Sequence, residues 1–204
     1  MAAAKANMAR IKVRPVFKSG PDPVFPDAAR LAGEFGKVEI SGIMGADGRI
    51  TEAKVSVSSR SSLLDASALA AATASLFEPA RDAQGEALSI PISVPLDFSN
   101  ARTFGKGAGI LRYHCDQFVR DYDWWHAHWP AKAHDDFYRM TVGLSVVMRI
   151  RGNNGSLDPS ALPKNDDFEA RWNAAIEACR KTPGLLFVDV FKPEGDGLRR
   201  LAGG

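Results

Sequence analysis

The clearest pattern of apolar and polar positions in this chain is a strict alternation between residues 88 and 98. The apolar positions are Leu88, Ile90, Ile92, Val94, Leu96 and Phe98. Serine, proline or aspartate occupies every position between them. Because successive side chains of a β-strand point to opposite faces of a sheet, this period of two predicts a strand with one buried face.

A β-hairpin is predicted ahead of that strand. Its first strand runs from about Lys37 to Met44, and Asp47-Gly48 marks the turn. Asp-Gly is typical of tight hairpin turns, because both central positions of the favoured turn have positive φ. The return strand is expected to place every second residue inward, at Ala53, Val55 and Val57.

Helical spacing is found on both sides of the hairpin. A short helix is expected from Asp27 to Ala32, ended by Gly33, and a longer alanine-rich helix opens at Ser62 and ends near Phe77. Ser62 and Asp65 fit a capping box. With the strands, these helices predict an α+β fold in which helices cover a small antiparallel three-stranded sheet.

The second half of the chain has the periodicity of helices, and it is expected to form a mainly α-helical subdomain. A first helix carries a seam of apolar residues spaced three and four apart: Leu111, Cys115, Phe118, Tyr122, Trp125 and Trp129. A second helix is expected at about residues 135–151, with Phe137, Met140, Leu144, Val147 and Met148 on one side. A third, at about residues 166–181, carries Phe168, Trp172, Ile176 and Cys179 inward. Residues 184–191 are expected to close the subdomain as a strand, followed by a frayed tail.

The breakers in the sequence divide the chain into three parts. Residues 1–20 are expected to be an irregular lead-in, residues 21–103 the sheet domain and residues 104–204 the helical subdomain. The glycine-rich stretch Phe104–Gly109 is the expected hinge. It does not fit a phosphate-binding glycine loop, because Ile110 occupies the place of the last glycine.

The composition of the chain excludes some classes of protein. An apolar fraction of 45% and a charged fraction of 25% describe a soluble globular protein, and a net charge of +2 gives no indication of nucleic-acid binding. No apolar run approaches the roughly 18 residues of a membrane span. The first residues lack the apolar core of a signal peptide, so the chain is expected to be cytosolic or to lack its export segment.

Side-chain chemistry offers no convincing active site. Four histidines surround Cys115, namely His114, His126, His128 and His134. On a helix, however, His126 and His128 would point about 200° apart, so no metal site is expected. Trp125 and Trp129 lie on the seam and are expected to pack rather than to form a binding platform, whereas Trp124 lies off the seam and its role stays open. The aspartates at 116, 121, 123, 135 and 136 are expected to be solvated. No serine has a nucleophile context, so no catalytic residue, metal or cofactor is expected.

Seven short motifs, in order, resemble the C-terminal domain of TonB-family energy transducers. They are Phe25-Pro-Asp-Ala-Ala-Arg, Gly36-Lys-Val, Gly45-Ala-Asp-Gly-Arg-Ile, Val57-Ser-Ser, Leu64-Asp-Ala-Ser-Ala-Leu, Phe77-Glu-Pro-Ala and Ile92-Ser-Val-Pro-Leu-Asp-Phe. The resemblance covers residues 21–98. The chain departs from the family in lacking the membrane helix and proline-rich spacer, and in carrying about a hundred further residues.

The resemblance implies a periplasmic protein-interaction module that is not an enzyme. Such a module binds an extended segment of an outer-membrane transporter, or another envelope partner, as an added strand. Inner-membrane motor partners are implied only if a membrane helix precedes this sequence. The alternative is a periplasmic scaffold that keeps the fold without transducing energy.

By analogy with the family, the partner would bind the strand at residues 88–98. The expected contact residues are Leu88, Ser89, Ile90, Pro91, Ile92, Ser93, Val94 and Leu96. Pro91 and Pro95 support an edge position, since proline is confined to sheet edges, yet neither can donate a hydrogen bond to a partner. An edge silenced by these prolines and covered by the second half is the alternative interpretation.

A periplasmic location also favours a disulfide between Cys115 and Cys179. Both cysteines lie on inward seams of helices that are expected to pack together. The bridge would contribute on the order of 4 kcal/mol in the chain-entropy model. Two buried thiols are the alternative.

Overall fold

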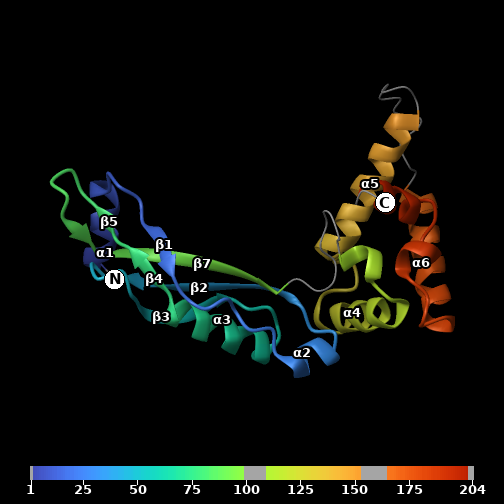
Figure 1. Ribbon diagram of the computed structural model, residues 1–204, viewed down its shortest axis with the longest axis horizontal. Coiled ribbons are helices and arrows are strands. Elements are labelled where there is room, and N and C mark those ends of the chain that lie inside the picture. The colour runs from blue at the N-terminus through green and yellow to red at the C-terminus, as the bar shows by residue number, and fades with distance from the viewer. Residues whose placement is uncertain (1, 99–108, 153–164, 202–204) are drawn as a thin grey trace. The chain divides into compact units, whose positions relative to one another are not determined.

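The computed structural model describes residues 2–98, 109–152 and 165–201 (Figure 1). The chain divides into two compact units, residues 1–99 and residues 100–204. Residues 104–108 of the expected hinge, and the boundary expected between residues 103 and 104, lie outside the described residues.

The first unit combines short helices with an antiparallel sheet. Its elements are α1 (Ala2–Asn7), the 3₁₀ turn η1 (Met8–Arg10), β1 (Val16–Ser19), α2 (Asp27–Leu31), β2 (Gly36–Met44), β3 (Ile50–Val57), α3 (Ser62–Ala74), β4 (Leu76–Glu78), β5 (Ala80–Arg81), β6 (Ala87–Leu88) and β7 (Ile90–Phe98). The expected α+β class is therefore confirmed for this unit, as is the predicted hairpin.

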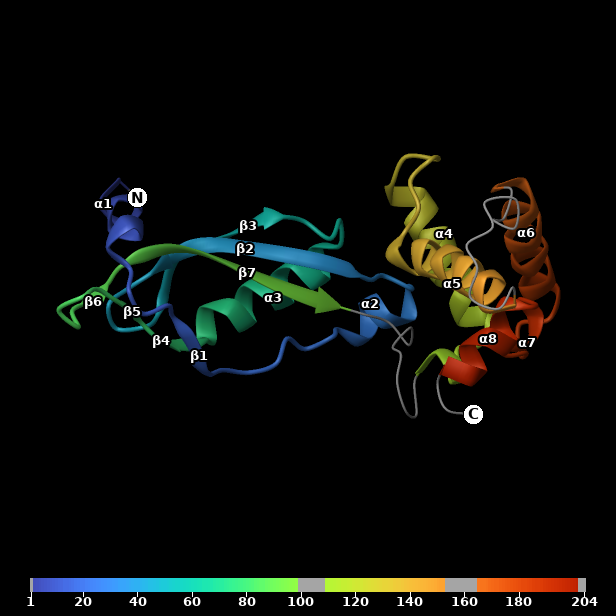
Figure 2. The ribbon, with the colours of Figure 1, turned by 90° about the horizontal axis from the view of Figure 1, so that it is seen from above.

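The main sheet has three strands in the order β3-β2-β7, all antiparallel. Strands β2 and β7 keep one continuous register from Gly36 opposite Phe98 to Met44 opposite Ile90. Two smaller antiparallel pairs, β1 with β4 and β5 with β6, complete the unit. Figure 2 shows β2 and β7 as the two long strands that run side by side.

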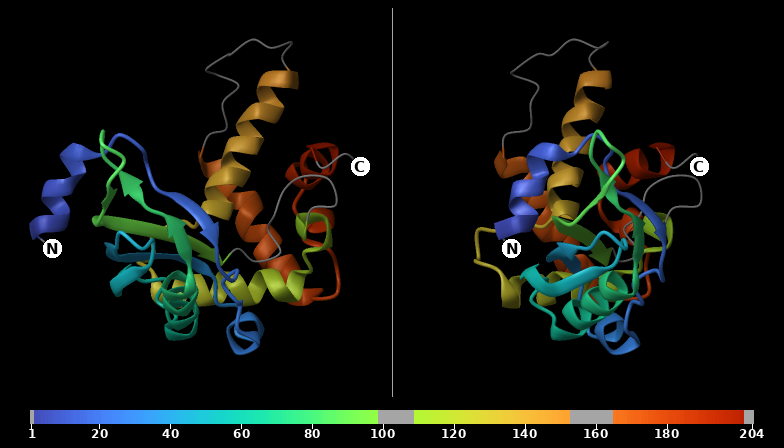
Figure 3. Two further views of the ribbon diagram at one scale, coloured as in Figure 1. Left: turned by 60° about the vertical axis from the view of Figure 1, so that its left-hand side comes forward. Right: turned by 90° about the vertical axis from the view of Figure 1, so that its left-hand side faces the viewer.

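The core of this unit lies between the sheet and α3. Val38 and Ile40 of β2 and Leu64 and Ala68 of α3 are fully buried together. Small alanines on this face of α3 allow the helix axis to approach the sheet closely. Figure 3 shows α2 and α3 on the same side of the long strands.

The N-cap of helix α3 lies one residue before the Ser62 of the predicted capping box. The N-cap is Ser61, whose Oγ accepts a hydrogen bond from Leu64 N at 3.2 Å. Asp65 instead accepts from Ser59 N at 2.9 Å. The helix ends at Ala74 and not near Phe77 as expected, and Leu76–Glu78 form β4 against β1.

Two further expectations for the first unit are wrong. Residues 1–20 are not irregular, because Lys12 N and Val13 N both donate to Arg81 O and β1 pairs with β4. These partners are distant in sequence, so local patterns do not reveal them. Val57, expected inward, is 52% exposed, because two β-bulges interrupt the alternation of β3.

The second unit is helical, as expected. Its elements are the 3₁₀ turn η2 (Gly109–Arg112), α4 (Cys115–His128), α5 (Asp136–Gly152), α6 (Asn165–Lys181), α7 (Phe187–Val190) and α8 (Glu194–Leu201). Its core is rich in aromatic rings, among which Phe118, Phe137, Trp172 and Phe187 pack against one another. The expected connection at 153–158 lies outside the described residues.

The end of the chain differs from the expected strand and frayed tail. Phe187, Val188 and Phe191 are all buried in the core. That spacing suits a helical turn rather than an alternating strand, and Phe187 N donates to Tyr113 O at 2.8 Å. Helix α8 replaces the tail, because Leu198 reaches the same core and Glu194 forms a buried ion pair with Arg171.

Several helical side chains also differ in burial from what the sequence pattern predicted. Trp124, expected off the seam, is only 8% exposed, and Val147, expected inward, is 44% exposed. Asp121 and Asp135, expected in solvent, are 0% and 8% exposed. Asp121 is buried because Tyr113 Oη donates to its Oδ2 at 2.6 Å. None of the helices in these described ranges has both the length and the apolar character to span a bilayer.

Candidate functional site

Strand β7 lies at one edge of the main sheet. On one side it pairs with β2, and in the described part of the chain no strand pairs with its other side. Its side chains alternate as the sequence predicts: Ile90 and Phe98 are buried, whereas Ser93, Pro95 and Asp97 are exposed. The strand therefore has one apolar face toward the core and one solvent face.

The direction of the main-chain groups of β7 follows from its neighbour. Thr51 Oγ1 donates to Ile43 O at 3.3 Å, and Ser56 Oγ donates to Glu39 O at 2.9 Å. Both acceptor carbonyls belong to β2 and both donors to β3, so Ile43 and Glu39 direct their main-chain groups toward β3. Pro91 and Pro95 are their register partners on β7. Two residues that lie opposite each other in an antiparallel pair direct their N–H and C=O groups either both toward each other or both away. Because Ile43 and Glu39 direct theirs toward β3, Pro91 and Pro95 direct theirs away from β2.

The outer side of β7 is consequently rich in acceptors and poor in donors. Positions 91, 93, 95 and 97 direct their carbonyl oxygens outward. Only Ser93 and Asp97 carry an N–H there, because proline has none. The two prolines thus leave the ladder with β2 intact and remove donors only from the outer edge.

The opposite edge strand, β3, is much less regular. Its register with β2 shifts twice, and Glu52 has a φ of 51° at one of the shifts. Bulges of this kind twist a strand and blunt its edge against further pairing. Of the two edges of the main sheet, β7 therefore offers the straighter template.

The start of the expected contact strand is occupied within the chain. Leu88 belongs to β6, where it is 3% exposed and pairs with Ala80. Ser89 O accepts a hydrogen bond from Asn7 Nδ2 of α1 at 2.9 Å. Leu88 and Ser89 are thus engaged inside the unit, and the open edge begins after them. No local pattern in the sequence indicates that Asn7 would reach this strand.

In the second unit, Cys115 and Cys179 form the disulfide that the sequence analysis favoured. Both cysteines are fully buried in the core, where the bridge joins the start of α4 to the end of α6. Among the described residues, no three potential ligands gather into a metal site.

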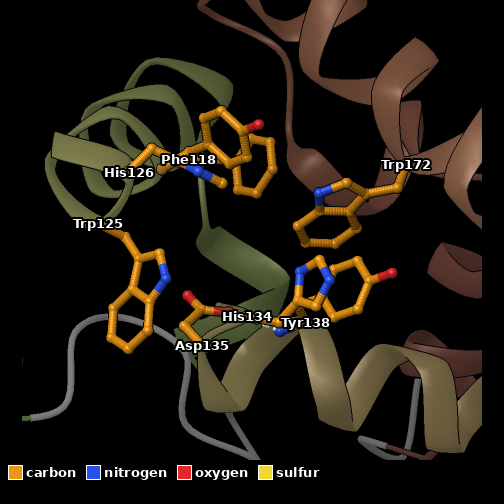
Figure 4. Close-up of a pocket in the computed structure, with 8 residues that line it drawn as sticks. Phe118, Trp125, His126, His134, Asp135, Tyr138 and Trp172 are labelled. Atoms are coloured by element: carbon orange, nitrogen blue, oxygen red, sulfur yellow. Dashed lines mark hydrogen bonds between the residues drawn. The ribbon is translucent and has the colours of Figure 1, made fainter. Parts of the chain in front are cut away.

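The histidines have different surroundings. His114 is exposed, and His128 Nδ1 lies 2.7 Å from Trp124 O of the preceding turn. His126 and His134 instead line one cavity together with Asp135 and aromatic rings (Figure 4). Burial lowers the pKa of His126, and the neighbouring Asp135 opposes that shift. Sequence reasoning did not bring His126 and His134 together, because the turn between α4 and α5 folds His134 back.

Trp125 and Trp129 stack on each other with ring centroids 4.0 Å apart and an interplanar angle of 3°. Trp125 Nε1 donates to Ala133 O at 3.3 Å, which fixes its ring beside the cavity. These tryptophans therefore pack among themselves, and Trp125 also presents one side to the cavity.

Comparison with known proteins finds similarity for part of the chain. Residues 21–99 match the family model described as the Gram-negative bacterial TonB protein C-terminal. The solution NMR structure of the TonB C-terminal domain of Pseudomonas aeruginosa is similar, with 24% sequence identity and a TM-score of 0.39. That match covers 45% of this chain and 92% of the other. No curated protein matches the chain significantly.

Proposed function

We propose that residues 21–99, which form a TonB-family C-terminal domain, bind an extended segment of an outer-membrane transporter or another envelope protein as an added strand along β7. TonB C-terminal domains are protein-interaction modules of the Gram-negative periplasm and not enzymes. The proposal extends that location and that non-enzymatic role to this chain.

The single observation that carries the proposal is the open outer side of β7. A sheet edge offers main-chain donors and acceptors that a peptide can satisfy by adding a strand. Nine consecutive register pairs hold β7 straight against β2. This support lets the strand act as a rigid template, so little ordering of the protein is needed on binding.

The edge also constrains the partner. Because the outward positions supply four carbonyls and only two N–H groups, a bound peptide would mainly donate hydrogen bonds. Its own carbonyls opposite Pro91 and Pro95 would remain with water. The partner that fits best is an extended peptide whose carbonyls at those two positions can stay hydrated. Specificity would come from side chains next to the exposed Ser93 and Asp97.

The same prolines favour the second candidate, a periplasmic scaffold that no longer captures peptides. Proline on an edge strand is a common protection against unwanted strand pairing. Here two of the four outward positions are proline. The two candidates differ in a single measurable property, which is the binding of an extended peptide at β7.

The test is a titration of the isotope-labelled chain with peptides from the extended segments of outer-membrane transporters. Capture predicts saturable shifts of amide signals confined to residues 90–98 and their partners on β2. The matched control is the same peptide with alternate main-chain amides N-methylated, which removes its donors. No shifts at millimolar peptide, or equal shifts with the methylated control, would contradict capture and favour the scaffold.

A further inference from the structure

The second unit, which the family match does not cover, contains a narrow cavity walled by aromatic rings. Phe118 and Trp125 of α4 lie on one side, and Tyr138 of α5 and Trp172 of α6 lie on the other (Figure 4). Tyr122 of α4 also lines the cavity. His134 stacks on Tyr138 with centroids 3.7 Å apart and an interplanar angle of 10°. Three helices and the turn before α5 therefore contribute to a single aromatic enclosure.

Asp135 brings a carboxylate into this enclosure. The residue is 8% exposed, and Figure 4 shows it between the Trp125 ring and the stacked pair of His134 and Tyr138. Its Oδ1 accepts a hydrogen bond from Tyr138 N at 2.8 Å, which caps α5. A carboxylate accepts several hydrogen bonds at once, so this cap does not prevent a contact with a cation.

The charges around the cavity have a net negative sign. Glu169 contacts two of the lining residues, because its Oε1 accepts a hydrogen bond from Tyr138 Oη and lies 3.9 Å from His134 Nε2. Arg180, which influences Tyr122 electrostatically, is already paired with Asp123 at 3.0 Å. The amino end of α5 contributes about half a positive charge, less than the two carboxylates supply.

Aromatic faces and a buried carboxylate together favour a positively charged guest. The negative face of an aromatic ring attracts a cation within about 6 Å, and more strongly where water is excluded. A neutral apolar guest would gain no charge attraction from the Asp135 carboxylate, and an anion would be repelled by it. The chemistry of the walls therefore selects for a cation.

The size of the cavity selects among cations. Its interior volume is about 10 Å³, which is room for a single water-sized group. A primary ammonium is of that size, whereas a trimethylammonium head is several times larger. A methylene chain behind the ammonium could lie along the open mouth of the cavity.

We propose that this cavity is a binding site for a primary alkylammonium group, held by the Asp135 carboxylate and by the aromatic wall that Trp125 contributes. The group would belong either to a lysine side chain of a partner or to a free diamine. The site is independent of strand capture at β7, because it lies in the other unit.

The test uses the whole chain and two probes at pH 8, where histidine side chains are ordinarily neutral. The probes are N-acetyl-lysine methylamide and 1,5-diaminopentane, and the readout is the indole N–H signal of Trp125. Both probes should cause saturable shifts of that signal if partner lysines are the source. Shifts with the diamine alone would support a free amine as the guest.

Asp135→Asn provides the decisive variant. Asparagine is as good an N-cap as aspartate, so α5 keeps its cap while the charge is lost. Binding should weaken at least tenfold. Asp136→Asn is the matched control, because it removes the same charge from the same helix end at an exposed position; it should leave affinity within twofold. Near-UV circular dichroism checks that both variants keep the aromatic packing.

Three results would overturn the proposal. The first is that neither amine shifts the Trp125 signal, even at ten times the concentration that would saturate a site with a millimolar Kd. The second is equal binding of an uncharged norleucine analogue or of tetramethylammonium. The third is an equal loss of affinity in Asp135→Asn and Asp136→Asn, which would indicate a general charge effect and not a site.

Discussion

At the scale of single residues, Gly48 shows how one position links the hairpin to the rest of its unit. Its φ is 80°, as the Asp-Gly turn requires, and its carbonyl accepts a hydrogen bond from Phe77 N at 2.9 Å. A Cβ atom at this position would lie 1.8 Å from Phe77 O. The turn thus demands glycine for two reasons, backbone conformation and the close approach of β4.

These two reasons can be separated by experiment. Gly48→Ala should destabilise the first unit by roughly 3 kcal/mol, since β4 must move as well as the turn. Gly85→Ala is the matched control, because Gly85 has a similar φ of 82° but a Cβ atom there would meet no other atom within 4 Å. It should cost only about 1 kcal/mol. Equal losses in urea unfolding would show that contact with β4 is unimportant.

Asp82 makes the stability of the first unit depend on pH. Burial raises the pKa of Asp82, but hydrogen bonds from Glu86 N, Arg10 and Gln84 N outweigh burial and hold the pKa below its usual value. A lowered folded-state pKa stabilises the fold above the unfolded value of about 3.9. That stabilisation is lost as the pH falls through the folded pKa.

Asp82→Asn should therefore be less stable than the parent at pH 7, and the difference should shrink as the pH falls below 4. Chemical unfolding at several pH values measures this. Amide exchange should also quicken near Lys12 and Val13, because Arg10 loses its ion pair with Asp82 at 2.6 Å. Asp22→Asn, at an exposed position, is the control. A stability gap that stays constant with pH would contradict the assignment.

At the scale of elements, the sequence predicted those strands and helices whose conformation depends on residues close together in the chain. The period of two gave β7 and its buried face, the Asp-Gly turn gave the hairpin, and the three long helices followed from their apolar seams. Strand β1 and helix α7 could not be predicted in this way. Their conformations depend on partners distant in sequence, such as Glu78 opposite Val16 and Tyr113 O beside Phe187 N.

The candidate site was predictable in part for the same reason. The edge position of β7 was inferred from its prolines and from the family resemblance, and the structure places it at an edge. The engagement of Leu88 by Ala80 and of Ser89 by Asn7 was not predictable, since it depends on the pairing of β5 with β6 and on the N-terminal helix. The cavity around Asp135 likewise depends on how three helices meet.

The outward donors of β7 give the sharpest test at this scale. Ser93→Pro removes one outer N–H and leaves the ladder with β2 untouched, so it should weaken a captured peptide about twofold to tenfold. Ser93→Ala is the control, because Ser93 Oγ donates to the Glu39 carboxylate and alanine removes only that contact. Pro91→Ala should strengthen peptide binding by a similar factor, since it restores a donor. If the peptide affinity measured by amide shifts were unchanged in both Ser93→Pro and Pro91→Ala, main-chain pairing at this edge would be excluded.

At the scale of the whole molecule, the two units have different sources of stability. The first unit relies on a sheet and one helix with small side chains, without a covalent cross-link. The second has an aromatic core and a disulfide between residues separated by 64 positions. All four tryptophans of the chain, at 124, 125, 129 and 172, belong to the second unit. Tryptophan fluorescence therefore reports on that unit alone.

This division predicts that the two units respond separately to matched substitutions. Replacing both Cys115 and Cys179 by alanine should destabilise the second unit by about 4 kcal/mol, because the unfolded chain regains the entropy of a long loop. The fluorescence transition in urea should shift accordingly, while amide exchange in β2 should not change. Gly48→Ala should do the reverse, since it acts only on the hairpin and β4. If either variant moved both transitions together, the units would fold as one, and the second half of the chain would be a structural support of the first and not a separate binding unit.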